Sequence, residues 1–225
     1  MTQIPAQVSL LVAVKPPREP RQLSLDKAAA ILAGGMQEFL AHGFAGTSMD
    51  RVAAAAGVSK ATVYNHFQDK EGLFVALIEQ LVQGKFQSIY DPGDLALQVE
   101  PKIFLRGLAH RVLDMGANEP QFLNFMRVII GESGRFPQLA QAFVRNIEQT
   151  SFRLLGAYFA ACPQLNLADP EATARIFIGS IVHFLIVQEM LHGKDIVPME
   201  RDRLIDTLID SIVGLGWRYH QTLQH

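Results

Sequence analysis

Residues 43–67, GFAGTSMDRVAAAAGVSKATVYNHF, contain two short helical segments separated by a glycine turn. Thr47 opens a capping box that predicts the start of the first segment. Gly57 ends that segment, because glycine adopts a left-handed backbone conformation at the lowest cost. Ser59 is a good N-cap for the second segment, which runs to Phe67. Two short helices joined by a tight, glycine-containing turn are typical of a helix-turn-helix unit.

The second segment leaves a polar face free once its apolar residues are buried. Val52, Val63 and Phe67 can close a small core between the segments. A helix with a polar face fits the major groove of DNA, where lysine donates to guanine and asparagine pairs with adenine. On an arbitrary helix such side chains are ordinary solvated surface, so the surrounding unit carries the prediction. The free residues are Lys60, Ala61, Thr62, Tyr64, Asn65 and His66.

Helical periodicity continues on both sides of this unit, and no stretch alternates as a strand does. Gly34 and Gly35 lie inside the helix expected before it, where each costs about 1 kcal/mol relative to alanine. We therefore expect another helix to approach closely at one or both of them. The expected helices are 24–42, 51–56, 60–67, 70–90, 101–116, 120–131, 137–161, 170–192 and 199–221.

A strong turn signal at 91–94 divides the chain. We predict an all-α protein with a flexible N-terminal arm at 1–22 and a helix-turn-helix DNA-binding domain at 23–90, including its connecting helix. The remainder, 91–225, is predicted to form a helical domain for ligand binding and dimerisation.

Composition narrows the class of protein. The 49% apolar share excludes a disordered chain, and a single cysteine, Cys162, excludes a disulfide scaffold and a zinc ribbon. Residues 21–90 carry six basic and six acidic side chains, so charge alone does not indicate DNA binding. No apolar run reaches the roughly 18 to 20 residues of a membrane span, and the first 20 residues lack a signal-peptide pattern. We expect a cytoplasmic protein without membrane contact.

At this point the sequence resembles the TetR/AcrR family of transcriptional regulators across about residues 25–80, and residues 122–143 resemble the C-terminal domain of AefR-like members more weakly. The resemblance implies a homodimeric regulator whose C-terminal domain binds a small effector. Repression is the family's usual mode. The matching residues are Gly43-Phe44, Thr47-Ser48-Met49, Val52 to Ser59, Thr62 to Phe67, Lys70 and Leu73-Phe74. The Gly34-Gly35 pair and the long N-terminal arm depart from the family's pattern.

The resemblance also implies how DNA is contacted. Phosphate contacts would come from Thr47 or Ser48 and from Tyr64, His66 and Lys70. Base reading would fall to four residues of the second short helix, Lys60, Ala61, Thr62 and Asn65.

Large apolar side chains of the second domain suggest a cavity between helices that binds a small, hydrophobic effector. Arg111 is a polar candidate among them, and each apolar residue could equally be plain core. The candidates are Phe104, Leu108, Arg111, Met115, Phe122, Phe125, Met126, Ile129 and Phe184.

The last two helices are the expected dimer surface, because apolar stripes there alternate with small residues that permit close packing. The stripes are Ile178, Ile181 and Leu185, then Leu204, Leu208, Ile212 and Leu215. Such a dimer would present two recognition helices about 34–36 Å apart and read a palindromic operator. An effector that binds two states unequally would then release the operator.

Two alternatives remain. The first is an all-α enzyme, because Glu189 and His192 have the Glu-x-x-His spacing found in helices that bind a di-iron centre. That site needs a second such pair, and the sequence contains neither this pair nor a nucleophile motif. A DNA-binding dimer without an effector is the other. We expect no enzymatic activity, no cofactor and no metal.

Overall fold

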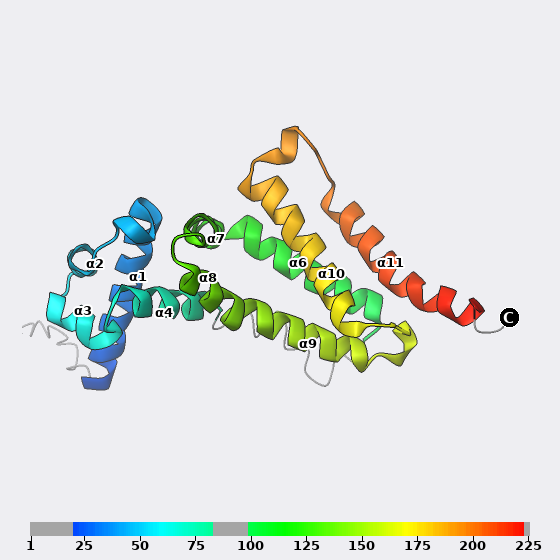
Figure 1. The fold of residues 1–225 in the computed structure, drawn as a ribbon, viewed down its shortest axis with the longest axis horizontal. Coiled ribbons are helices and arrows are strands. Elements are labelled where there is room, and N and C mark those ends of the chain that lie inside the picture. Colours follow the sequence, from blue (N-terminus) through cyan, green and yellow to red (C-terminus); the bar gives the residue numbers. More distant parts are fainter. Residues whose placement is uncertain (1–19, 83–98, 223–225) are drawn as a thin grey trace, which may run out of the picture.

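The computed structural model describes residues 20–82 and 99–222, and the described residues are helices and turns without strands. The all-α prediction is confirmed. In Figure 1 the first four helices gather at one end of an elongated molecule and the later ones form a bundle beyond them. The first group is α1 (Pro20–Gly46), α2 (Met49–Ala56), α3 (Lys60–Phe67) and α4 (Lys70–Val82). The bundle is α6 (Pro101–Asn118), α7 (Pro120–Glu132), α8 (Pro137–Phe143), α9 (Gln149–Ala160), α10 (Pro170–Phe184) and α11 (Arg201–Thr222).

Two of the expected long helices contain a π-helical stretch. The segment η2 (Val144–Glu148) joins α8 to α9, and η4 (Leu185–Met190) continues α10. Shorter 3₁₀ turns, η3 (Pro163–Leu165) and η5 (Gly193–Asp195), follow α9 and η4. π turns inside α-helices are frequent at functional sites, and the periodicity of the sequence did not indicate these two.

α1 begins four residues earlier than expected, and its regular part ends where predicted. Gly43 has a φ of 67°, which interrupts the helical run directly after His42. A β-carbon on Gly34 would lie 3.0 Å from the backbone nitrogen of Ala56, and one on Gly35 would lie 3.0 Å from Leu73. The close approach expected at this glycine pair is therefore confirmed at both positions.

The helix ends in the helix-turn-helix unit are formed as the sequence predicts at Gly57 and Ser59, but the predicted cap of α2 is wrong. Gly57 has a φ of 65°, and its N–H donates to the carbonyl oxygens of Ala53 and Ala54. Ser59 accepts a hydrogen bond from the N–H of Thr62. The N-cap of α2 is Ser48, not Thr47, because the Ser48 hydroxyl oxygen accepts from the N–H of Arg51.

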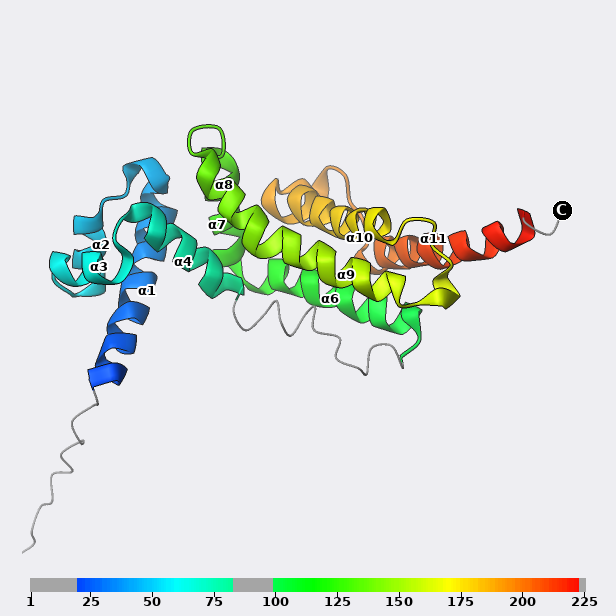
Figure 2. The same ribbon diagram turned by 60° about the horizontal axis from the view of Figure 1, so that its bottom comes forward.

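An aromatic cluster joins the two groups of helices. The ring centroid of Phe44, in the last turn of α1, lies 5.5 Å from that of Phe74 of α4 and 4.8 Å from that of Phe136, which follows α7. Phe74 in turn packs 4.7 Å from Phe125 of α7. Figure 2 shows α4 leading from the first group toward α8 and α9 of the bundle. The first group and the bundle thus share one hydrophobic core.

Within the bundle, α6 runs antiparallel to α11, and exposed ion pairs line their seam. Lys102 pairs with Asp210, Arg106 with Asp206, and His110 with Asp202. Such exposed pairs each contribute about 0–1 kcal/mol, so they set the register of the helices more than their stability.

The helix Pro170–Met190 is long and apolar enough to cross a membrane by length and composition alone. One helix of this kind is weak evidence for a membrane span, and its inward side chains, such as Phe177 and Ile181, are buried in the bundle core. The expected end of the connecting helix at 83–90, the turn at 91–94 and arm residues 1–19 lie outside the described residues.

Candidate nucleic-acid interface and internal cavity

α3 presents an open face of polar residues because its one fully buried side chain, Val63, anchors the opposite face. Tyr64 is 42% exposed, and Lys60, Ala61 and Asn65 are exposed with it. His66 is half-buried beside the ring of Phe67. Thr62 is also half-buried, and its hydroxyl lies 2.8 Å from that of Ser59. The predicted recognition residues therefore share one helix, with four of them freely accessible.

Lys60 is held beside α2 by Asp50. Its Nζ lies 2.7 Å from Asp50 Oδ1, and that hydrogen bond raises the pKa of the lysine. Both side chains are exposed, so the pair costs little to break. Lys60 can therefore exchange the carboxylate for a DNA group, and it also lies 5.8 Å from the ring centroid of Tyr64.

Thr47 and Lys70, two other predicted phosphate contacts, are hydrogen-bonded to backbone carbonyl oxygens around the start of α2. Thr47 is buried, and its hydroxyl donates toward the carbonyl oxygens of Gly43 and Glu38, at 2.8 and 3.0 Å. Lys70 Nζ donates to the carbonyl oxygens of Phe44 and Thr47, at 2.7 and 3.1 Å, and lies 4.4 Å from the Phe44 ring centroid. Ser48 is exposed at the start of α2, so of the predicted Thr47 or Ser48 pair only Ser48 is accessible.

We expect Lys70→Ala to lower the melting temperature by about 5 °C. Hydrogen bonds from a charged donor are worth roughly 1.5–3 kcal/mol, and 1 kcal/mol corresponds to about 2–4 °C in a chain of this size. Thermal unfolding followed by circular dichroism measures the change. Lys60→Ala is the matched control, because its exposed ammonium should leave the melting temperature unchanged. Equal melting temperatures for both variants would contradict the positioning role of Lys70.

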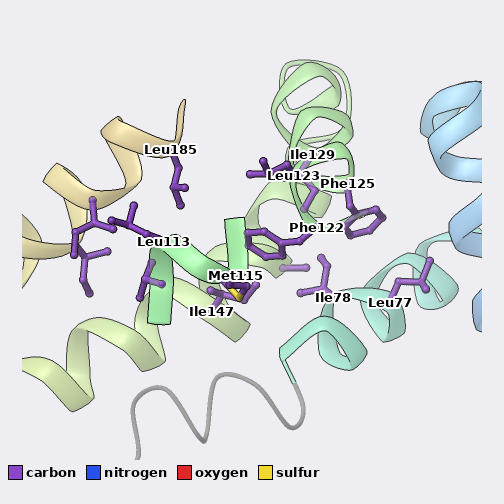
Figure 3. Packing of buried hydrophobic residues seen from close by; sticks show 14 of the residues in the cluster. Leu77, Ile78, Leu113, Met115, Phe122, Leu123, Phe125, Ile129, Ile147 and Leu185 are labelled. Carbon is purple, nitrogen blue, oxygen red and sulfur yellow. The ribbon is translucent and has the colours of Figure 1, made fainter. Parts of the chain in front are cut away.

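A small apolar cavity of about 90 Å³ lies between helices of the bundle. Of the predicted ligand residues, Met115, Phe122 and Met126 line it. Figure 3 shows Phe122 directed from α7 toward Met115, whereas Phe125 leaves the helix toward α4 and Leu77. Its other lining residues are Val112, Leu123, Ile130, Phe143, Ile147, Glu148, Ser151, Ile178, Val182, Leu185, Ile186 and Met190.

The remaining predicted ligand residues do not line this cavity. Phe125 packs against Phe74, and Phe104 lies 4.2 Å from the Tyr158 ring centroid. Leu108 and Ile129 are buried in the general core, Phe184 is half-buried, and Arg111 is exposed. The sequence had no signal for Glu148 and Ser151, because a lone glutamate and serine on a long helix are ordinary surface residues.

Both π segments contribute to the cavity wall. Ile147 and Glu148 come from η2, and Leu185, Ile186 and Met190 come from η4. Arg127 of α7 donates to the carbonyl oxygens of Glu189 and Met190, at 3.2 and 3.0 Å, and so ties α7 to the end of η4. Among the described residues, no three metal-ligating side chains lie together.

The predicted dimer stripes face into the chain rather than outward. Ile178, Ile181 and Leu185 of α10 are buried within the bundle, as are Leu208 and Ile212 of α11. Leu204 is half-buried, and the side chain of Leu215 lies outside the described residues. The outer face of α10 instead exposes Ile176, at 61%, and Gly179, with Ser180, His183 and Leu204 around a shallow hollow.

Two family descriptions match the chain. Residues 31–77 match "Bacterial regulatory proteins, tetR family", and residues 104–215 match "AefR-like transcriptional repressor, C-terminal domain". The two matches fall on the helix-turn-helix group and on the bundle, so both parts of the fold are similar to the same family.

Curated relatives are helix-turn-helix regulators. The chain is 30% identical over 99 residues to the transcriptional repressor SCO4008 of Streptomyces coelicolor, covering 44% of this chain and 46% of the relative. It is 38% identical over 56 residues to the transcriptional regulator RutR of Escherichia coli, covering 25% and 26%. The matched region thus spans less than half of these relatives.

Solved structures share the fold over almost their whole length. The Flavonoid-responsive Regulator FrrA is 28% identical, with a TM-score of 0.67 over 86% of this chain and 96% of that one. GusR of Salmonella enterica is 22% identical, with a TM-score of 0.67 over 89% and 98%.

Proposed function

Since the chain belongs to the TetR family of bacterial regulatory proteins, whose members are transcriptional regulators and not enzymes, we propose that it is a ligand-responsive, sequence-specific repressor. In this proposal it binds a palindromic operator as a cytoplasmic homodimer and leaves it when a small, largely hydrophobic effector binds. The observation that supports the DNA-binding role most strongly is the exposed face of α3. Val63 anchors the opposite face in the core, and Lys70 donates to the carbonyl oxygens of Phe44 and Thr47 in the segment before α2.

Base reading is proposed for the exposed residues of α3, and phosphate binding for the groups around it. Lys60 and Asn65 would read bases, with Ala61 and Thr62 contacting base edges in the same groove. Ser48, Tyr64 and His66 would contact phosphates. Because the protein carries a net charge of −2, specific geometry must supply affinity that a basic surface would otherwise provide.

Titration of the protein into duplex DNA from upstream of its own gene tests this function. Binding that survives unrelated competitor DNA at two salt concentrations would support a sequence-specific regulator. If unrelated competitor DNA removes the protein from the upstream duplex as effectively as the same duplex does, the binding is not sequence-specific and the proposal is contradicted. An operator-bound dimer that no effector releases, and that no small molecule stabilises against heat, would instead indicate a regulator without an effector.

Dimerisation is proposed through the outer face of α10 together with α11. A β-carbon on Gly179 or Gly214 would meet no atom within 4 Å, so packing inside the chain does not require glycine there. Glycine within a helix costs about 1 kcal/mol, which close packing of a second copy would offset. Exposed Ile176, one turn from Gly179, supplies apolar area beside them.

Gly179→Arg should convert the dimer into a monomer of 24.9 kDa, because the new side chain would stand between the two α10 helices. Sedimentation velocity at micromolar concentration measures the mass. Gly134→Arg, in the turn after α7, is the matched control, since its β-carbon would also meet no atom within 4 Å. If the Gly179→Arg variant remains a dimer, the interface does not include the outer face of α10.

Coupling between effector and DNA is proposed to run through α7. One face of α7 lines the cavity with Phe122 and Met126, while Phe125 packs on Phe74 of α4. At the end of α7, Glu132 accepts a hydrogen bond from the N–H of Ala45, at 3.3 Å. An effector that displaces α7 would therefore shift α4 and the helix-turn-helix unit together, and would favour the state with lower operator affinity.

A further inference from the structure

The cavity is small in this conformation. Its volume of about 90 Å³ is far below the roughly 300–1,000 Å³ of ligand-binding pockets. A ligand of several heavy atoms must therefore push the walls apart. The two π segments form part of these walls, and π turns inside α-helices are frequent at functional sites.

The cavity wall carries one charged side chain among the described residues, that of Glu148 in η2. No hydrogen-bond or ion-pair partner of Glu148 lies within residues 20–82 and 99–222. Burial raises its pKa, since the carboxylate is stabilised less there than in water. A carboxylate that lacks a partner beside an apolar cavity can regain stabilisation only from a ligand or from water.

The other polar wall residue, Ser151, can offer a ligand only its lone pairs. Its hydroxyl donates its proton to the carbonyl oxygen of Ile147, at 2.9 Å, so the hydroxyl oxygen is left to accept a hydrogen bond. Ser151 and Glu148 lie within one turn of each other on the same wall. The polar part of this cavity therefore offers acceptors, and the rest offers apolar surface.

Neighbouring arginines do not neutralise Glu148. The carboxylate also borders a surface hollow between α9 and the start of α10, which contains Arg145, Arg153 and Arg175. Arg175 is paired with Glu171, at 2.8 Å, and its guanidinium lies 5.0 Å from the Phe152 ring centroid. Glu148 thus stands between cavity and surface hollow with its charge uncompensated by an ion pair among the described residues.

We infer that the cavity selects an apolar molecule carrying one protonated amine, with Glu148 and Ser151 accepting the N–H groups of that amine. This inference rests on the proposed effector role of the cavity and narrows the effector from hydrophobic molecules in general to cationic ones. The apolar part would lie against Phe122, Met126 and Leu185, between α7 and η4.

Two matched series of probes test the inference by isothermal titration into the purified protein. They are cyclohexylmethylamine, cyclohexylmethanol and cyclohexanecarboxylate, then octylamine, octanol and octanoate. In at least one series the amine should bind about tenfold or more tightly than the alcohol, since charge-assisted hydrogen bonds are roughly twice as strong as neutral ones. The carboxylate should bind more weakly than the alcohol, because it repels Glu148.

Glu148→Gln should remove the preference for amine over alcohol and should raise the melting temperature by about 2 °C by eliminating an unpaired charge. Glu200→Gln, an exposed glutamate before α11, is the matched control and should keep the preference. Ser151→Ala, which keeps the carboxylate, should weaken amine binding a few-fold and serves as a second variant if Glu148→Gln is unstable.

Equal binding of amine and alcohol, a preference that persists in Glu148→Gln, or no binding by either amine would overturn the inference. Operator release is scored separately. Amines that bind with the expected preference but leave the operator complex intact would support the ligand class and contradict the proposed release mechanism.

Discussion

Replacing Tyr64 with alanine is expected to weaken operator binding by about 10- to 100-fold while dimer mass and helix content stay unchanged. Tyr64 is 42% exposed on α3 and contributes little to the core, so the variant should fold normally. A hydrogen bond to a charged phosphate is worth about 1.5–3 kcal/mol, and each 1.4 kcal/mol changes affinity about tenfold.

Lys60→Ala should lose similar affinity and, unlike Tyr64→Ala, should alter the salt dependence if the ammonium displaces a counterion. Removal of one phosphate-neutralising cation lowers the slope of log affinity against log salt by about 0.9. A lysine that reads guanine alone would leave the slope nearly unchanged. Fluorescence anisotropy at several salt concentrations separates the two roles.

Lys102→Ala, on α6, removes the same charge far from α3 and is the matched control. It should change neither the affinity nor the slope. Unchanged affinity in both the Tyr64 and Lys60 variants would refute the placement of the DNA-binding surface on α3.

The second large effect is expected for Phe44→Ala, which should lower the melting temperature by about 10 °C. Phe44 is 1% exposed and packs against Phe39, Phe74 and Phe136 under the ammonium of Lys70. Truncation of a buried phenylalanine costs about 3–5 kcal/mol through lost transfer energy and the cavity left behind. Thermal and urea unfolding of the two proteins measure the difference.

Phe44→Leu is the control that keeps most of the side-chain volume, so it should lose much less stability. It should nevertheless reduce the coupling between the bundle and the helix-turn-helix unit, because Phe44 bridges Phe74 and Phe136. A Phe44→Ala variant within 1 °C of the parent would show that this aromatic cluster does not hold the two groups of helices together.

Local signals in the sequence sufficed for the helix-turn-helix unit. Gly57 adopts the left-handed conformation expected of it, and Ser59 caps α3 as predicted. Of the six residues named as free on α3, four are exposed, because Val63 and Phe67 mark the inward side of the helix, while Thr62 and His66 are half-buried. These features depend on backbone conformation and on neighbours within four residues, which a single sequence displays.

The cap of α2 illustrates a local ambiguity. Thr47 and Ser48 are adjacent, and either could cap the helix by sequence. Tertiary contacts decided between them, because the Thr47 hydroxyl is turned inward to the carbonyl oxygens of Gly43 and Glu38. Ser48 was left to accept from the N–H of Arg51.

The roles of Lys70 and Glu148 also required the three-dimensional structure. Lys70 reaches a carbonyl oxygen 26 residues earlier in the chain, a pairing that no local pattern encodes. Glu148 looks like surface in the sequence, yet it lies at the end of η2 and lines the cavity.

The sequence by itself determined the all-α class, the position of the helix-turn-helix unit and the side of α3 that faces outward, because these follow from periodicity, caps and turns. Only the tertiary structure decided which face of α10 is free. That helix is apolar on two sides, with Ile178 and Ile181 on one and Ile176 on the other. Periodicity cannot distinguish an apolar face that packs within the chain from one that would pack against a second copy, since both are apolar.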